Sequence, residues 1–119
     1  MTDIPQKRRY FRLPVRMQVN VFDPSGVKYS LNTHDLSAGG MNLVAEGGFP
    51  VNSYLKLQFN LEGESFPISA VGLVKWVKPL ENKKWSMGVE FIQLEEAARE
   101  KIVKFINTKS LELRRRGLI

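Results

Sequence analysis

Residues 15–33 read VRMQVNVFDPSGVKYSLNT and contain two extended runs on either side of a short turn. From Val15 to Val21 every second residue is apolar and the residues between them are polar, which is typical of a strand with one buried face. In Asp23–Gly26 the proline supplies a fixed φ and the glycine a permissive position, as a reverse turn requires. The stretch therefore predicts strands over residues 15–22 and 27–33 that pair as a β-hairpin.

The chain continues with further extended runs that are separated by turn residues. Breaks rich in glycine, proline and acidic residues fall at 37–40, 47–50 and 62–64. The alternating patterns between these breaks predict strands over residues 41–45, 55–61, 66–77 and 85–92. Six strands joined by hairpin-length links favour a closed or nearly closed antiparallel β-barrel, because closure removes exposed strand edges. The predicted core is all-β.

After Glu95 the apolar residues change from a two-residue period to a helical one. Those that fall on one side of a helix are Ala98, Ile102, Phe105 and Ile106. We expect an amphipathic helix over about residues 95–113 that packs on the barrel, and a partner-binding or membrane-surface helix is the alternative. Arg114–Arg116 is most simply a solvated end of this helix, and an anion-binding role is the alternative.

The composition is that of one soluble globular domain. The chain has 119 residues, 43% hydrophobic and 25% charged, which is enough to close a single core. Without cysteine, disulfides and cysteine-ligated zinc are excluded, and a single histidine leaves few routes to a metal site. No segment resembles a signal peptide or a membrane span, so we expect a cytoplasmic protein without membrane insertion. The net charge of +6 indicates an anionic partner: nucleic acid, nucleotide, acidic protein or lipid surface.

His34 is the single imidazole of the sequence and the first candidate for a catalytic base. Asp35 follows it directly, and neighbours in a strand point to opposite faces, so we do not expect the two to act together. No serine–histidine–aspartate order and no paired-carboxylate motif is found elsewhere in the sequence. We therefore expect no enzyme activity, no catalytic residue and no metal site, with His34 a partly exposed strand residue.

Residues 34–43, HDLSAGGMNL, place an acid, a hydroxyl and two glycines at the break between two strands. One explanation is structural: the side chains cap turn amides, and the glycines permit a bulge with positive φ. The other is a binding site, because Asp35 and Ser37 share one face beside the open backbone of Gly39 and Gly40. A carboxylate can accept from the Watson–Crick edge of guanine, and arginine can form a fork with O6 and N7. An anionic guanine nucleotide would therefore use Asp35 together with arginines.

Two spaced motifs make the sequence recognisable. Residues 8–12, RRYFR, contain R-x-x-x-R, and residues 35–40, DLSAGG, contain D-x-S-x-x-G. In this order and at this separation the chain resembles the PilZ domain family. Residues 72–76, GLVKW, and 88–91, GVEF, are similar to two strand motifs of that family, so the resemblance covers nearly the whole chain.

The resemblance implies a receptor for the bacterial second messenger cyclic di-GMP, a dianionic ring of two guanosines. The implied fold is a six-stranded antiparallel PilZ-type β-barrel with a C-terminal α-helix, over residues 15–119. A flexible arginine-bearing segment, residues 1–14, would precede it and close over the ligand, which would alter the surface offered to an unidentified downstream protein. Apart from the ligand no cofactor is expected, and no DNA or RNA partner.

Carried over position by position, the implied cyclic di-GMP-binding residues are Arg8, Arg12, Asp35, Ser37 and Gly40. Secondary candidates are Lys7, Arg9, Gly39 and Trp76. The motif arginines would contact guanine edges and phosphates, for which a planar guanidinium is better suited than an ammonium. Asp35 would accept from one guanine, Ser37 would contact a phosphate or base, and Gly40 would leave room for the ligand. Trp76 belongs either to the core or to the barrel mouth beside a base.

Both the number of cyclic di-GMP molecules bound per chain and the function itself have alternatives. Lys7 stands where some family members have a further arginine, and variation there is associated with one bound ligand or an intercalated pair. PilZ-like chains without the motifs serve as nucleotide-independent protein adaptors, although this chain retains both motifs. A basic barrel could also bind nucleic acid, but the sequence lacks the stacked-aromatic strand motif of single-strand binders.

Overall fold

The computed structural model describes residues 10–119, which form seven strands and one helix. The elements are β1 (Leu13–Pro14), β2 (Gln18–Phe22), β3 (Lys28–Ser37), β4 (Gly40–Ala45), β5 (Tyr54–Phe59), β6 (Ile68–Pro79), β7 (Trp85–Gln93) and α1 (Glu96–Arg115). The alternating apolar residues form the inward faces of the strands, most regularly in β5, where every second residue from Leu55 to Phe59 is buried. The predicted β core followed by a C-terminal helix is confirmed.

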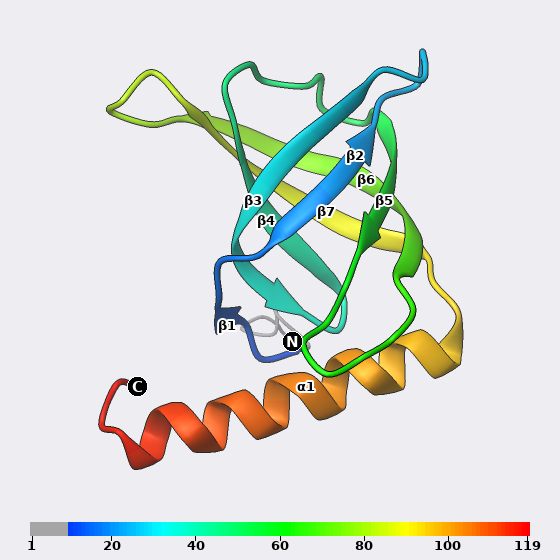
Figure 1. Ribbon diagram of the computed structural model, residues 1–119. Helices are drawn as coiled ribbons and strands as arrows, with labels where there is room; N and C mark the ends of the chain where they lie inside the picture. Colours follow the sequence, from blue (N-terminus) through cyan, green and yellow to red (C-terminus); the bar gives the residue numbers. More distant parts are fainter. Residues whose placement is uncertain (1–9) are drawn as a thin grey trace, which may run out of the picture.

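Six of the strands close into an antiparallel barrel (Figure 1). Around the barrel the order is β2, β5, β6, β7, β4 and β3, and β3 pairs with β2 to complete the ring. β3 pairs with β2 through residues 28–32 and with β4 through residues 32–37. β1 is the extra strand, and it pairs with the last part of β3, where Leu13 lies opposite Leu36. The predicted six-stranded barrel is therefore confirmed, with β1 added at one end.

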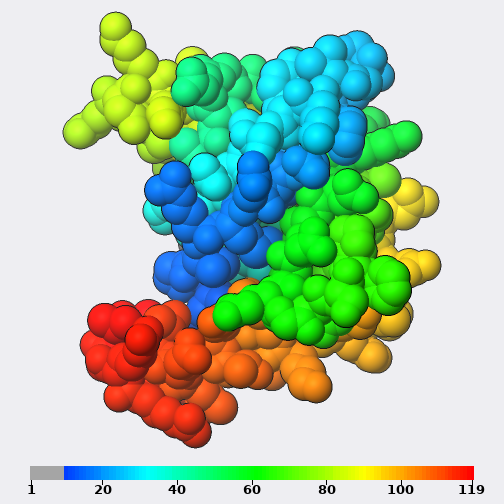
Figure 2. All heavy atoms as spheres, viewed as in Figure 1, coloured from blue at the N-terminus to red at the C-terminus, as the bar shows by residue number. Residues whose placement is uncertain are grey.

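One continuous core fills the barrel and extends to α1. Its fully buried side chains include Leu13, Val19, Val21, Leu36, Met41, Leu43, Val74 and Met87. Figures 1 and 2 show α1 running beneath the strands at one end of the barrel. Ile102 and Ile106 are buried there, and Ala98 and Phe105 pack against the core at the margin, so the predicted apolar stripe is confirmed. Burial of each isoleucine contributes about 1.5–3 kcal/mol to stability.

Two predicted strands have different boundaries in the structure. Residues 15–22 are not one strand, because the segment between β1 and β2 is held by Thr33 instead. The Thr33 hydroxyl donates to the carbonyl oxygen of Val15 and accepts from the N–H of Met17 at 3.0 Å. The strand predicted to end at residue 33 continues to Ser37, because it changes partners and pairs with β4. At the other end, Leu13 and Pro14 of the predicted N-terminal segment belong to the sheet.

A β-bulge in β3 changes which of its side chains face the core. Thr33 lies opposite Leu43 and Asp35 lies opposite Asn42, so His34 is an extra residue in the ladder. Thr33 is buried before the bulge, and Leu36 is buried after it. Asp35, which strict alternation would point into the barrel together with Thr33, therefore lies on the outer surface.

A second bulge does the same in β6. Val74 lies opposite Val89 and Trp76 opposite Gly88, so Lys75 is the extra residue. Every second residue from Ile68 to Val74 is buried, whereas beyond the bulge it is Val77 that packs against the core. The indole of Trp76 is thereby moved from the inside of the barrel to its outside.

Candidate functional site

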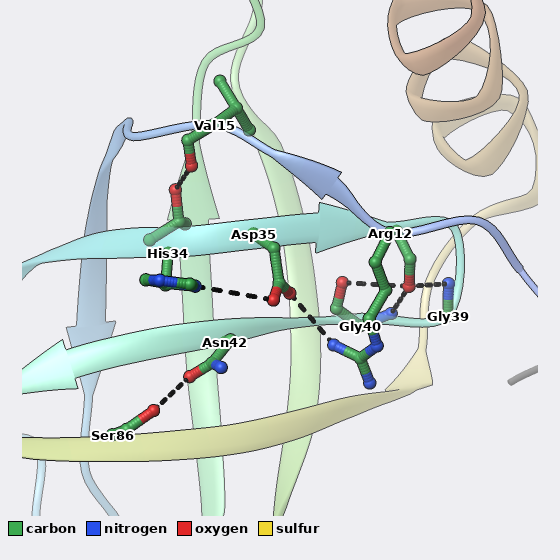
Figure 3. A network of polar contacts seen from close by, with 10 residues as sticks. Arg12, Val15, His34, Asp35, Gly39, Gly40, Asn42 and Ser86 are labelled. Atoms are coloured by element: carbon green, nitrogen blue, oxygen red, sulfur yellow. Dashed lines mark hydrogen bonds and ion pairs between the residues drawn. The ribbon is translucent and has the colours of Figure 1, made fainter. Parts of the chain in front are cut away.

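The two motifs of the sequence meet at an ion pair between Arg12 and Asp35 (Figure 3). Nη1 of Arg12 donates a hydrogen bond to Oδ1 of Asp35 at 2.9 Å, across 23 positions of the chain. β1 brings the two together, because Pro14 lies opposite Asp35 in the sheet. The side chains are 29% and 16% exposed, so the pair is half-buried and still reachable from solvent. A charge-assisted bond of this kind fixes both groups at one place on the outer surface.

His34 lies beside the same carboxylate. Its Nδ1 is 3.8 Å from Oδ2 of Asp35, and Figure 3 shows Asp35 between His34 and Arg12. The expectation that His34 and Asp35 point to opposite faces is therefore wrong, because the bulge at His34 interrupts the alternation. The side chain of His34 is 71% exposed, more than the partly exposed strand residue that the sequence predicted.

Ser37 organises the turn between β3 and β4. Its Oγ accepts hydrogen bonds from the N–H groups of Gly39 at 3.1 Å and Gly40 at 3.2 Å. The hydroxyl in turn donates to the carbonyl oxygen of Gly40 at 3.3 Å. The carbonyl of Gly39 accepts from the N–H of Phe91 at 2.8 Å, and that of Ala38 accepts from the guanidinium of Arg99. The turn is therefore bonded within itself, to β7 and to α1.

Gly39 and Gly40 are required by close packing. A Cβ at Gly40 would lie 2.1 Å from the carbonyl oxygen of Val89 in β7, and one at Gly39 would lie 2.9 Å from the ring of Tyr10. Neither glycine has a positive φ; among the described residues, the glycines that do are Gly26, Gly63 and Gly117. The suggestion that Gly39 and Gly40 permit a positive-φ bulge is therefore wrong. The proximity of β4 to β7 explains Gly40, and the ring of Tyr10 lies against Gly39.

Trp76 lies across Gly88 on the outside of the barrel. A Cβ at Gly88 would come within 2.2 Å of Nε1 of Trp76, so only glycine allows the ring to lie there. The residue is 37% exposed, and Nζ of Lys78 lies 5.5 Å from the ring centroid. The ring is therefore on the outer surface and is not part of the buried core, so the core position considered for Trp76 is not the one found.

These residues surround one hollow of about 360 Å³ on the outer surface. It is lined by Tyr10, Arg12, Ser37, Gly39, Gly40, Lys75, Trp76, Gly88, Val89 and Glu90. Asp35 adjoins it through its bond to Arg12. A larger groove of about 870 Å³, between β5, β6 and the start of α1, holds none of the predicted site residues. Lys7, Arg8 and Arg9, also predicted, lie outside the described residues.

The sequence matches the family model of the PilZ domain over residues 6–108. The chain belongs to the PilZ domain family. The match includes both motifs and all the strands of the barrel. No curated protein matches the sequence.

Solved structures of other proteins share this PilZ fold. The inhibitor of motility MotI/DgrA of Bacillus subtilis has a TM-score of 0.81 at 21% identity, over 92% of this chain and 54% of its own. The PilZ domain of YcgR from Escherichia coli, solved with c-di-GMP, has a TM-score of 0.74 at 15% identity, over 94% and 98%. The K. pneumonia MrkH–c-di-GMP complex has a TM-score of 0.74 at 19% identity, over 95% and 57%. The chain thus spans little more than half the length of MotI/DgrA and MrkH.

Five residues that line the hollow were not predicted as site residues from the sequence: Tyr10, Lys75, Gly88, Val89 and Glu90. Tyr10 lies within the R-x-x-x-R motif but is not one of its arginines, and its ring lies against Gly39. Lys75 and Glu90 occupy variable positions of the two strand motifs, and only the register between β6, β7 and β4 brings them to the hollow. No local pattern in the sequence distinguishes them from other exposed charged residues.

Among residues 10–119, no three histidine, cysteine, aspartate or glutamate side chains lie close enough together to hold a metal ion. Within the same range, no helix combines the length and the apolar character that crossing a membrane requires.

Proposed function

We propose that this PilZ domain is a receptor for cyclic di-GMP. The observation that carries the proposal is the meeting of both motifs at one hollow, where Arg12 bonds Asp35 and where Ser37, Gly40 and Trp76 form the walls. Two proteins of the same fold, the YcgR PilZ domain and MrkH, are solved with this nucleotide. A net charge of +6 also suits a dianionic ligand.

In this proposal Asp35 and Arg12 exchange their mutual contact for contacts with the ligand. Asp35 accepts hydrogen bonds from N1–H and the exocyclic amino group of one guanine, while Arg12 binds a phosphate or the O6 and N7 edge. The pair already holds both side chains in place, because Oδ1 of Asp35 is bonded at 2.9 Å and the carboxylate is only 16% exposed. Both side chains are thus held beside the hollow before the ligand binds, which lowers the entropic cost of ordering them, and the contacts with the ligand replace the ion pair that is lost.

The other residues of the hollow supply its shape. Trp76 offers an exposed indole face against which a purine can stack. The hydroxyl of Ser37 is already bonded to the amides of the turn, so its proposed contribution is to hold the Gly39–Gly40 backbone in position against the ligand. Gly40 itself keeps this backbone free of a side chain.

Calorimetry with cyclic di-GMP tests the proposed function. We expect saturable binding with a Kd of order 1 μM, and far weaker binding of GTP, GMP or an oligonucleotide. Arg12→Ala should cost about 2–5 kcal/mol of binding free energy, since the ligand group that Arg12 is proposed to bind is then left unpaired. Arg16→Ala, an exposed arginine that does not line the hollow, is the matched control and should change little. No heat at about 100 μM cyclic di-GMP would reject the proposal and favour a nucleotide-independent adaptor.

We further propose that the segment containing Lys7, Arg8 and Arg9 closes over the bound ligand and so changes the surface offered to a downstream protein. Trypsin tests this step, because it cleaves after these residues and after Arg12 only while the segment is open. Saturating cyclic di-GMP should slow this cleavage at least about tenfold, which corresponds to roughly 1.4 kcal/mol of protection. Cleavage at Arg114–Arg116 should not change. Equal slowing at both ends would indicate general stabilisation of the fold and would contradict a closing segment.

A further inference from the structure

An ion pair that belongs to neither the R-x-x-x-R nor the D-x-S-x-x-G motif forms part of the hollow. Nζ of Lys75 in β6 lies 3.7 Å from Oε1 of Glu90 in β7, and both residues line the hollow together with Arg12 and Trp76. Their side chains are 53% and 54% exposed. The pair is therefore in contact with solvent and adjacent to the place where the ligand is proposed to bind.

The bulge in β6 gives Lys75 this position. In a regular strand, Lys75 and Trp76 would point to opposite faces of the sheet. Because Lys75 is the extra residue between Val74 and Trp76, both side chains emerge on the outer surface, beside each other. An ammonium group thus accompanies the indole on which a guanine is proposed to stack.

Glu90 is placed less favourably for an anionic ligand. It lies directly opposite the motif residue Gly40 in the pairing of β4 with β7. Among the described residues that line the hollow, the charged ones are Arg12, Lys75 and Glu90. Each of the two cations has an acidic partner, Arg12 with Asp35 and Lys75 with Glu90. Glu90 would repel a dianionic ligand. Arg12 and Lys75 would attract it if their side chains turn toward it.

We propose that Lys75 is an additional ligand-binding residue, whose ammonium leaves Glu90 and binds a phosphate of cyclic di-GMP. This inference rests on the proposed function. The exchange costs little, because the Nζ–Oε1 separation of 3.7 Å is too long for a hydrogen bond and exposed ion pairs contribute little to stability. The lysine side chain is long and flexible and carries three donors, so it can turn to the phosphate. Glu90 is then a competing anion that lowers the affinity of the site.

The test is a double-mutant cycle in which the affinity for cyclic di-GMP is measured by calorimetry. Lys75→Met keeps the length of the side chain and should weaken binding about tenfold, whereas Glu90→Gln should strengthen it about threefold. In the Glu90→Gln background, Lys75→Met should again weaken binding about tenfold, because the phosphate contact is still lost. The Lys75→Met protein should also lose less affinity than the wild type when salt is raised.

The outcomes separate direct contact from other effects. If Lys75→Met has no effect once Glu90 is replaced, Lys75 only neutralises Glu90 and the inference is wrong. The matched control is the pair Lys101–Glu64, at 3.3 Å and 47% and 37% exposed, which does not line the hollow. Lys101→Met and Glu64→Gln should leave the affinity within about twofold. Equal effects there would show that only bulk charge matters.

Failure of this inference can be told apart from failure of the proposed function. If the wild-type chain binds no cyclic di-GMP, both are overturned. If it binds and the Lys75 variants bind equally well, the receptor function stands and only the role of Lys75 is rejected.

Discussion

The two ends of β3 carry turns of the same design in different surroundings. Before β3, Oδ1 of Asp23 accepts from the N–H and the hydroxyl of Ser25 and from the N–H of Val27, at 2.7–3.0 Å. After β3, Oγ of Ser37 accepts from the N–H groups of Gly39 and Gly40. In each turn one side-chain oxygen collects the free amide donors, as aspartate and serine do in turns.

The difference lies in what surrounds the two turns. The Asp23 turn is exposed, and a further hydrogen bond to its carboxylate comes from the hydroxyl of Tyr29 at 3.3 Å. The Ser37 turn is buried and is also held by Phe91 of β7 and Arg99 of α1. Side-chain capping is therefore enough to form the Asp23 turn. The Ser37 turn has further contacts from β7 and α1, which make it a rigid wall of the hollow. A ligand that binds against this turn loses little free energy to ordering the backbone of the protein.

The largest expected effect comes from adding one methyl group to each turn. Gly40→Ala should lower the free energy of unfolding by about 3 kcal/mol, because the new Cβ would meet the carbonyl oxygen of Val89 at 2.1 Å. Gly26→Ala has open space around it, and its cost of roughly 1–2 kcal/mol comes from the φ of +90°. Urea unfolding of both variants measures the difference. Equal losses would mean that β4 and β7 move apart easily at Gly40.

Replacing the two serines should have the next largest effect. Ser37→Ala leaves two amides of a buried turn without their acceptor, which costs about 1–3 kcal/mol of stability. Ser25→Ala removes the hydroxyl donor to Asp23 in an exposed turn where water can substitute, and should cost clearly less. Ser37→Ala should also weaken cyclic di-GMP binding, whereas Ser25→Ala should not. Unfolding midpoints and calorimetry on the same two proteins test both statements, and a loss of affinity in Ser25→Ala would contradict the comparison.

Elements with a single uninterrupted period could be predicted from the sequence. β5 alternates without a break, and the buried stripe of α1 through Ile102 and Ile106 follows the helical period. The resemblance to PilZ domains added the motif residues, and the structure brings Arg12, Ser37, Gly40 and Trp76 to one hollow. Both kinds of prediction use residues that can be read directly from the sequence, as an uninterrupted period or as a short motif.

The orientation of the site could not be predicted, because it depends on register between strands. Asp35 and Trp76 face outward only because one extra residue precedes each of them, and a bulge is defined by the partner strand. The incorrect expectation for His34 has the same cause. Lys75 and Glu90 were missed for a related reason, since their neighbours Trp76 and Gly40 are set by pairing across β6, β7 and β4.

A smaller effect is expected from the contact that ties the Ser37 turn to α1. Arg99→Met keeps the aliphatic stem but removes the donor to the carbonyl oxygen of Ala38, at a cost of about 1 kcal/mol. We expect a matching loss of cyclic di-GMP affinity, because the turn is less well held. Tyr29→Phe is the counterpart at the other turn, since it removes the hydroxyl bond to Asp23. It should leave the affinity unchanged, and an equal loss in both variants would show that the surroundings of the turns do not matter for binding.

The smallest expected effect is a pH dependence confined to the exposed turn. The hydrogen bonds from Ser25 and Val27 lower the pKa of Asp23 below its ordinary value of 3.8. A carboxyl whose pKa is lowered by folding stabilises the protein above its unfolded pKa, and this contribution disappears as the pH falls through the folded pKa. Asp23→Asn should therefore be less stable than the wild type at pH 7, and the gap should narrow below about pH 4. Thermal unfolding of both proteins between pH 7 and the lowest pH at which they stay folded measures this. A constant gap would mean that the charge of Asp23 contributes nothing to the turn, whereas a gap that closes while cyclic di-GMP binding at pH 7 stays the same in both proteins would confirm that this turn serves the fold alone.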